Sequence, residues 1–149
     1  MESRTLQLPD LAATEALAAR VAALARAGDA ILLSGPLGAG KSAFARAFLR
    51  ASAGDPGLEV PSPTFTLVQS YDLPCGTAHH FDLWRLSGPE DLAELGWEEA
   101  RAGIVLVEWP DRLGALAPAD ALRVALAPGA EEAARDAVLS GWPGRIGLL

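Results

Sequence analysis

Residues 32–42 read Leu-Leu-Ser-Gly-Pro-Leu-Gly-Ala-Gly-Lys-Ser, and the rest of the chain is best understood from this stretch. From Gly35 to Ser42 the spacing is G-x-x-x-x-G-K-S, the phosphate-binding pattern called the P-loop. An apolar run precedes the pattern and a helix-like segment follows it. This order predicts an α/β fold in which the loop leaves the carboxyl end of a buried, parallel strand.

The composition of this loop suits the binding of a polyphosphate. Backbone N–H groups at a helix N-terminus hold the anion, and glycines let the backbone curve closely around it. Lys41 would place its ammonium on the β- and γ-phosphates, and the Ser42 hydroxyl would ligate Mg²⁺. The alternative is a glycine-rich turn that only caps an ordinary helix. The candidate nucleotide-binding residues are Gly35, Leu37, Gly38, Ala39, Gly40, Lys41 and Ser42.

Lys41 is the only lysine in the chain, and every other Lys or Arg position is an arginine. A compact ammonium fits inside a phosphate loop, whereas a planar guanidinium does not. A chain that uses arginine for its surface cations therefore has a specific reason to place lysine here. The single lysine favours nucleotide binding over the simple helix cap.

Length and composition predict one domain over residues 1–149. Half of the residues are apolar, which is enough for a solid core. No apolar run reaches about 18 residues, and residues 1–4 lack the charged and apolar regions of a signal peptide. The single cysteine, Cys75, cannot form an internal disulfide. We therefore expect a cytoplasmic protein without a membrane partner.

The formal net charge of −7 argues against a protein that binds nucleic acid by itself. Affinity for phosphate backbones comes largely from clustered lysine and arginine, and no basic cluster is visible. Any role with RNA is therefore expected to go through a protein partner.

Apolar periodicity predicts alternating strands and helices along the chain. Strands are expected at residues 4–8, 30–33, 65–71, 77–86 and 104–107, and helices between Asp10 and Gly28, at 42–53 and at 89–95. Two alternating runs in the tail, 122–126 and 137–141, most simply form an antiparallel pair, and no chemistry is expected there. The predicted fold is α/β: a P-loop NTPase-like mixed sheet flanked by helices, with antiparallel strands added.

Two segments after the P-loop carry candidate catalytic groups. Residues 61–64, Pro-Ser-Pro-Thr, form a stiff polar loop in which the Thr64 hydroxyl could reach Mg²⁺ or a γ-phosphate. A plain proline-rich connector is the alternative. Asp82 lies in a predicted strand otherwise poor in acids, and isolated carboxylates are seldom buried without a partner. A zinc site built from Cys75, His79, His80 and Asp82 is not favoured, because their spacing fits no strong zinc pattern.

Residues 104–109, Ile-Val-Leu-Val-Glu-Trp, give the second strong signal. A buried strand ended by an acid has the form of a Walker B element, whose carboxylate holds Mg²⁺ directly or through water. Glu108 is thus predicted to hold the metal with Ser42; the alternative is a carboxylate that merely leaves the strand into solvent. Trp109 could stack on a nucleotide base, cover the site or close the core. No second cation beyond Lys41 is evident for charge stabilisation.

Four segments taken together resemble the TsaE (YjeE) family, bacterial P-loop ATPases needed for the threonylcarbamoyl modification of the adenosine beside the tRNA anticodon. They are residues 34–42, 62–65 (Ser-Pro-Thr-Phe), 80–86 (His-Phe-Asp-Leu-Trp-Arg-Leu) and 107–110 (Val-Glu-Trp-Pro). The resemblance covers nearly the whole chain, and the tail beyond Leu126 matches weakly. The family usually has tyrosine in place of Trp84 and often threonine in place of Ser42. Both replacements keep the chemical group, an aromatic face and a hydroxyl.

The resemblance implies ATP and Mg²⁺ as ligands, a switch-like role for Thr64, and a complex with TsaD-like and TsaB-like proteins. The resulting hypothesis is a Mg²⁺-dependent ATPase, weak alone and stimulated by its partners, that meets tRNA only through that complex. A small nucleotide or metabolite kinase, and a nucleotide-dependent binding module with negligible turnover, are the alternatives. The residue types themselves do not distinguish ATP from GTP. The catalytic candidates are Lys41, Thr64, Asp82 and Glu108.

Overall fold

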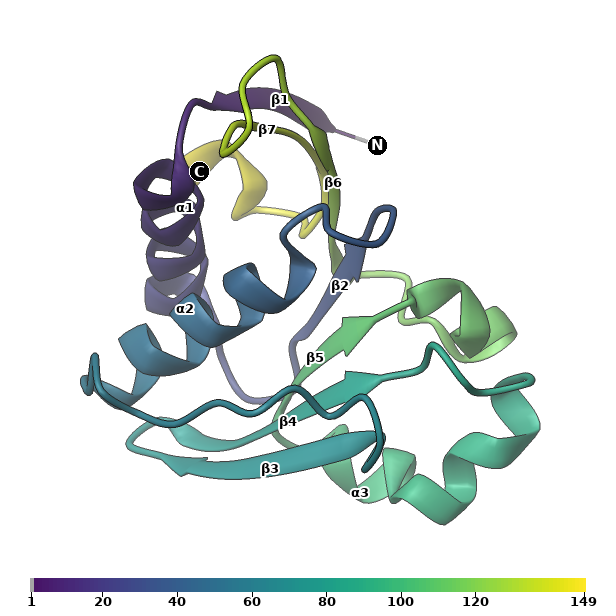
Figure 1. The fold of residues 1–149 in the computed structure, drawn as a ribbon. Helices are drawn as coiled ribbons and strands as arrows, with labels where there is room; N and C mark the ends of the chain where they lie inside the picture. The colour runs from purple at the N-terminus through teal and green to yellow at the C-terminus, as the bar shows by residue number, and fades with distance from the viewer. Residues whose placement is uncertain (1) are drawn as a thin grey trace.

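Seven strands form one mixed sheet in a computed structural model that describes residues 2–149. The strand order across the sheet is β1-β7-β6-β2-β5-β4-β3, and the sheet twists strongly from end to end (Figure 1). The strands are β1 (Ser3–Leu8), β2 (Ala30–Ser34), β3 (Val68–Leu73), β4 (Gly76–Asp82), β5 (Ile104–Glu108), β6 (Leu122–Pro128) and β7 (Arg135–Gly141). The helices are α1 (Leu11–Leu24), α2 (Lys41–Ala53), α3 (Trp97–Ala100) and the 3₁₀ segments η1 (Pro89–Leu95), η2 (Pro110–Leu116) and η3 (Ile146–Leu148).

The centre of the sheet is parallel and both of its margins are antiparallel. Strand β2 pairs in parallel with β5 and β6, and β4 pairs in parallel with β5. Strand β3 adds to β4 in the antiparallel sense, as β7 adds to β6 and β1 to β7. The expected α/β mixed sheet with added antiparallel strands is confirmed. The parallel strands all end at one edge of the sheet, which we call the carboxyl edge.

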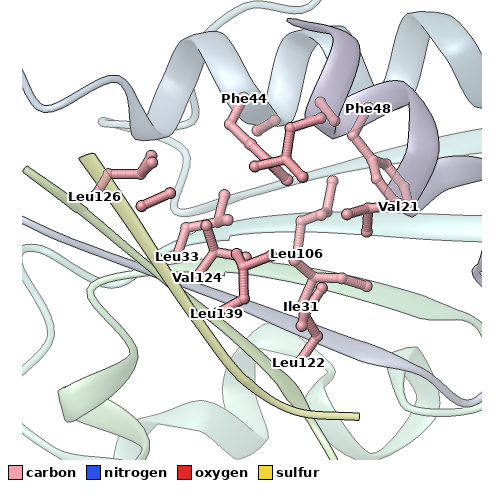
Figure 2. Close-up of a cluster of buried hydrophobic side chains, with 14 of the residues drawn as sticks. Val21, Ile31, Leu33, Phe44, Phe48, Leu106, Leu122, Val124, Leu126 and Leu139 are labelled. Atoms are coloured by element: carbon pink, nitrogen blue, oxygen red, sulfur yellow. The ribbon is translucent and has the colours of Figure 1, made fainter. Parts of the chain in front are cut away.

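Each face of the sheet packs against its own set of helices. Helices α1 and α2 cover one face, where Phe44, Phe48 and Val21 contact apolar side chains of the strands (Figure 2). The other face is covered by η1, α3 and η2, with Phe81 meeting Trp97 edge-on at 5.2 Å between ring centroids. In β2, alternate residues supply the two cores, because a strand buried on both faces is apolar throughout.

The helix ends follow local signals with one exception. The Asp10 side chain accepts a hydrogen bond from the Ala13 N–H at 2.9 Å and caps α1 as expected. Gly54 ends α2 in the left-handed conformation. The predicted end of α1 at Gly28 is wrong, since the helix stops at Leu24. The Asp29 carboxylate accepts a hydrogen bond from the Arg26 N–H at 2.6 Å. Residues 26–29 therefore form a turn and do not continue the helix.

The predicted strands at 65–71 and 77–86 are correct in kind but wrong in extent. Strand β3 begins only at Val68, because Leu67 has a positive φ of 69° and its N–H donates to the Pro63 oxygen at 2.7 Å. Strand β4 ends at Asp82, whose carboxylate accepts from the Trp84 N–H at 3.1 Å and turns the chain. None of the helices within residues 2–149 combines the length and the apolar character needed to cross a membrane.

Candidate functional site

The P-loop lies at the carboxyl edge, between β2 and α2. Gly35, Gly38 and Gly40 all have positive φ, between 83° and 142°. A side chain at Gly35 would also collide with the backbone oxygen of Leu126 on β6. The loop encloses a pocket of about 220 Å³ lined by Leu37, Gly38, Gly40, Lys41, Ser42 and Ala43. The left-handed glycines, the close approach at Gly35 and the pocket favour the phosphate-binding interpretation over a simple helix cap.

Lys41 is held inside the loop. Its side chain is only 5% exposed, and its ammonium donates to the backbone oxygens of Gly35 at 2.6 Å and Pro36 at 3.0 Å. The Trp109 ring covers it, with 4.4 Å from Nζ to the ring centroid. Burial lowers the pKa of Lys41, and the charges of Glu108 and Asp82 act in the opposite direction. The ammonium is therefore already directed into the loop that would hold the phosphates.

Glu108 meets the P-loop from the neighbouring strand. The Ser42 hydroxyl donates to Glu108 Oε1 at 3.2 Å and approaches Oε2 at 3.4 Å. His80 on β4 contacts the same carboxylate, with 2.7 Å between His80 Nε2 and Glu108 Oε2. Glu108 is only 3% exposed, so it does not leave the strand into solvent. A hydroxyl and a buried carboxylate, both oxygen donors, are the ligand types that Mg²⁺ prefers.

Thr64 and Asp82 form the other side of the site. Asp82 is buried and lies beside Glu108 in the β4–β5 register. Thr64 shares a 2.7 Å hydrogen bond with the Ser62 hydroxyl, and its own hydroxyl donates weakly to Asp82 Oδ2 at 3.5 Å. The shorter link from this loop to the carboxyl edge is made by the backbone, where the Leu67 oxygen accepts from the Asp82 N–H at 2.9 Å, and the switch-like role of Thr64 stays a prediction.

Trp109 lies immediately after β5 and covers the site from above Lys41. Its backbone is left-handed, with φ of 60°, an uncommon conformation for a bulky residue. Its ring also packs against Trp84 at 4.6 Å between centroids. The ring lies over Lys41 and also packs against the core on the η1, α3 and η2 face, so covering the site and closing the core are both compatible with this position.

Arg135, the first residue of β7, is a second cation at the P-loop that the sequence did not reveal. Its Nε donates to the Ala39 oxygen at 3.0 Å and its Nη2 to the Gly38 oxygen at 3.2 Å. Nη1 donates to the backbone oxygens of Glu132 and Ala134. Because this guanidinium is occupied by four backbone oxygens, it adds no free cation to Lys41 at the site, and the expectation that the tail carries no chemistry stays a prediction.

A larger pocket adjoins the P-loop on the side of α1. It measures about 370 Å³ and is lined by Leu11, Thr14, Gly40, Ala43, Glu132, Ala133 and Arg135. Gly40 and Ala43 also line the P-loop pocket, so the two spaces share a wall. The Thr14 hydroxyl is buried and has no hydrogen-bond partner within residues 2–149. Part of this pocket is therefore polar and unsatisfied.

The relationship of this chain to known proteins extends along most of its length. The profile of the family described as "Threonylcarbamoyl adenosine biosynthesis protein TsaE" matches residues 8–137. The chain belongs to the TsaE family. The P-loop, the 61–64 loop and Glu108 all lie inside the matched range.

Three individual TsaE proteins are between 32% and 41% identical to this chain over the aligned residues. The "tRNA threonylcarbamoyladenosine biosynthesis protein TsaE" of Rickettsia bellii is 39% identical over 114 residues, which cover 76% of this chain and 78% of the relative. The Rickettsia felis protein of the same name is 41% identical over 99 residues, 66% of this chain and 57% of the relative. The Bacillus subtilis protein is 32% identical over 117 residues, 76% and 70% of the two chains. This chain thus spans little more than half the length of the Rickettsia felis protein.

The fold of this TsaE-family chain also has a solved counterpart. The crystal structure of Bacillus subtilis YdiB superposes with a TM-score of 0.75 at 23% identity, over 99% of this chain and 90% of YdiB. The P-loop arrangement seen here is therefore an established fold.

The TsaE-family site gathers most of the residues singled out by sequence. Lys41, Ser42, Asp82 and Glu108 converge on the carboxyl edge, and Thr64 reaches it through Asp82. The four residues of the disfavoured zinc site do not converge, because His79 bonds Ser70 on the opposite face from His80 and Cys75 is exposed. Sequence reasoning missed Arg135 and the contact of His80 with Glu108. The antiparallel hairpin predicted for the tail is the signal that could have placed the start of β7 at this edge.

Proposed function

We propose that this TsaE-family protein binds ATP with Mg²⁺ at the carboxyl edge and hydrolyses it slowly by itself. The contact between Ser42 and Glu108, beside the Lys41 ammonium, is the observation that carries the proposal. It places side by side a hydroxyl and a carboxylate, the two kinds of oxygen ligand that a P-loop metal site uses. The donor types fit Mg²⁺, with Ser42 and Glu108 as its protein ligands.

The protein groups would divide the work of phosphoryl transfer to water. Lys41 would leave the Gly35 and Pro36 oxygens for the β- and γ-phosphates, which are stronger acceptors. Asp82 would orient the attacking water, and Thr64 would close over the γ-phosphate. Bound Mg²⁺ would neutralise the charge of the phosphate oxygens. Positioning and charge stabilisation of this kind are the main needs of the reaction.

The nucleoside of ATP would occupy the 370 Å³ pocket beside α1. The pocket shares Gly40 and Ala43 with the P-loop, so a chain of phosphates could pass from one space to the other. Trp109, whose ring centroid lies 4.4 Å from Lys41 Nζ, would cover the γ-phosphate end of the ligand. The size of the pocket suits a small ligand fragment with a few polar contacts.

The site lacks a free cation for the transition state among the described residues closest to it, because Arg135 is engaged by four backbone oxygens. A weak ATPase that needs a partner is the expected consequence. We propose that TsaD-like and TsaB-like proteins supply this stimulation in the cytoplasm, and that tRNA is met only through them. Phe65, 83% exposed in the 61–67 loop, and Leu37, 84% exposed in the P-loop, give a partner apolar contacts at the mouth of the site.

Phosphate release from ATP tests this function. We expect slow release by the protein alone, dependence on Mg²⁺, and release several-fold faster when the TsaD-like and TsaB-like proteins are added. Turnover only with an added small-molecule acceptor would identify a kinase instead. Tight nucleotide binding with no phosphate release under any of these conditions would identify a binding module.

A further inference from the structure

His80 is a buried polar residue of the candidate site whose role follows from its single contact. It lies on β4 two residues before Asp82, so both side chains are on the face that α2 covers. Its residue is 1% exposed, and its Nε2 is 2.7 Å from Glu108 Oε2. No other hydrogen bond of His80 side-chain atoms occurs within residues 2–149, where its Nδ1 is buried without a partner.

The chemistry of Glu108 fixes the direction of this contact. A carboxylate can only accept hydrogen bonds, so at 2.7 Å the proton must be on His80 Nε2. Burying an imidazole costs free energy that an apolar residue of similar size would avoid. That cost is offset here only by the donation to Glu108, since the other ring nitrogen has no partner in the described part of the chain. The polar contact that His80 makes is therefore with the Glu108 carboxylate, and its other ring nitrogen contributes no hydrogen bond to the core within residues 2–149.

The contact with His80 distinguishes the two oxygens of Glu108, although the Ser42 hydroxyl lies within 3.4 Å of both. Oε2 receives the short bond from His80, while Oε1 is the nearer oxygen to the Ser42 hydroxyl, at 3.2 Å. A hydrogen bond to Oε2 restricts rotation of the carboxylate and so restricts the position of Oε1. Groups that hold a metal ligand in this way raise metal affinity by restricting the ligand before the metal arrives.

We propose that His80 is a positioning residue that holds the Glu108 carboxylate with Oε1 toward Ser42, so that a divalent cation is bound there together with the nucleotide phosphates. This inference rests on the function proposed above. It assigns His80 no contact with nucleotide, so its effect is confined to the metal-dependent part of the affinity.

Two variants separate positioning from packing. In His80→Gln, the amide nitrogen lies the same number of bonds from the backbone as Nε2 and can still donate to Glu108. In His80→Asn, the amide is one bond shorter and cannot reach. Affinity for a fluorescent ATP analogue is measured for each protein in EDTA and in Mg²⁺, with thermal unfolding as a check of the fold.

We expect Mg²⁺ to tighten analogue binding in the wild type and in His80→Gln. In His80→Asn this tightening falls by about 10-fold to 100-fold, the range for lost groups that support a metal ligand, while affinity in EDTA stays unchanged. An undiminished Mg²⁺ effect in His80→Asn, or an equal loss in EDTA and in Mg²⁺, overturns the proposal for His80 and leaves the ATPase proposal standing. Absence of a Mg²⁺ effect in the wild type overturns both.

A second measurement applies if His80→Asn does not fold. Long-range ¹H–¹⁵N spectra of the wild-type imidazole report which ring nitrogen carries a proton. We expect a proton on Nε2 of His80. An unprotonated Nε2 would overturn the proposed donation to Glu108.

Discussion

Lys41 is a candidate phosphate-binding side chain that is buried inside the P-loop. Its ammonium is buried against two backbone oxygens of the P-loop, and burial lowers its pKa. Backbone oxygens satisfy the hydrogen bonds of an ammonium but do not neutralise its charge. A polyphosphate would accept hydrogen bonds from the ammonium and would also neutralise its charge. We therefore expect Lys41 to exchange the Gly35 and Pro36 oxygens for phosphate oxygens when a nucleotide binds.

The substitution Lys41→Ala is predicted to remove stabilisation by ATP and Mg²⁺. Ligand at about 100 times its Kd stabilises the wild type by about 2.7 kcal/mol, which a thermal shift assay measures. The variant should show little or no shift. Arg20→Ala, on the exposed face of α1, serves as the control and should keep the full shift. An unchanged shift in Lys41→Ala would refute its role at the phosphates.

The Ser42 hydroxyl is predicted to act through Mg²⁺. Ser42→Thr keeps the hydroxyl that contacts Glu108 and should keep the Mg²⁺ effect on nucleotide affinity. Ser42→Ala should lose most of that effect, about 10-fold or more, because a ligand is removed and Glu108 loses a partner. Titration of a fluorescent ATP analogue with and without Mg²⁺ measures both. Equal Mg²⁺ effects in the two variants would exclude Ser42 as a ligand.

The β6–β7 hairpin takes part in the site through its connection. Arg135 joins the hairpin to the P-loop by donating to the backbone oxygens of Gly38 and Ala39. The same guanidinium holds the connection itself through Glu132 and Ala134. Such a fork of bonds restricts the conformation of the P-loop backbone at Gly38 and Ala39.

Arg135→Ala is therefore predicted to weaken nucleotide binding by about 10-fold, the effect of losing hydrogen bonds worth about 1.5 kcal/mol. The loss should be the same in EDTA and in Mg²⁺, because Arg135 acts on the loop and not on the metal ligands. Arg135→Lys should not restore binding, since an ammonium cannot reproduce the planar fork. Arg123→Ala, an exposed arginine on β6, is the matched control. Wild-type nucleotide affinity in Arg135→Ala would contradict the proposal that Arg135 restricts the P-loop.

The sequence predicted those elements whose pattern lies in one contiguous stretch of residues, and it did not predict contacts between distant residues. The P-loop, β5 ending at Glu108 and the tail hairpin follow from contiguous patterns, and all are confirmed. The start of β3 could not be predicted, because the left-handed Leu67 leaves no mark in the residue types. Arg135 meets Ala39 across 96 positions, and the His80–Glu108 pair spans two strands, so both required the register of the sheet.

An ion pair between Asp29 and Arg145 joins two parts of the chain that are 116 positions apart. Arg145 near the C-terminus donates to both carboxylate oxygens of Asp29, each at 2.7 Å, and stacks 4.2 Å from the Trp142 ring centroid. Burial acts to raise the pKa of Asp29. Hydrogen bonds from Arg145 and from the Arg26 N–H, with the charge of Arg145, lower it on balance below its ordinary value of 3.8.

Arg145→Met is predicted to lower the free energy of unfolding near neutral pH by about 1.5–3 kcal/mol, the range for hydrogen bonds to charged groups. A carboxyl with a lowered folded pKa stabilises the protein above its unfolded pKa and loses this effect as pH falls through the folded value. The difference between wild type and variant should therefore shrink below pH 3.8. Urea unfolding at several pH values measures it, with Arg20→Met as the control. A difference that does not change with pH would contradict the ion pair.

Taken as one body, the sheet brings the P-loop, two buried carboxylates and a hydroxyl-bearing loop to its carboxyl edge. The most direct measurement is a crystal structure with a non-hydrolysable ATP analogue and Mg²⁺. We predict Lys41 Nζ on the phosphates instead of the Gly35 and Pro36 oxygens, with Mg²⁺ between Ser42 and Glu108. Phosphates bound outside the P-loop, or Mg²⁺ held without Ser42 and Glu108, would contradict the proposed site.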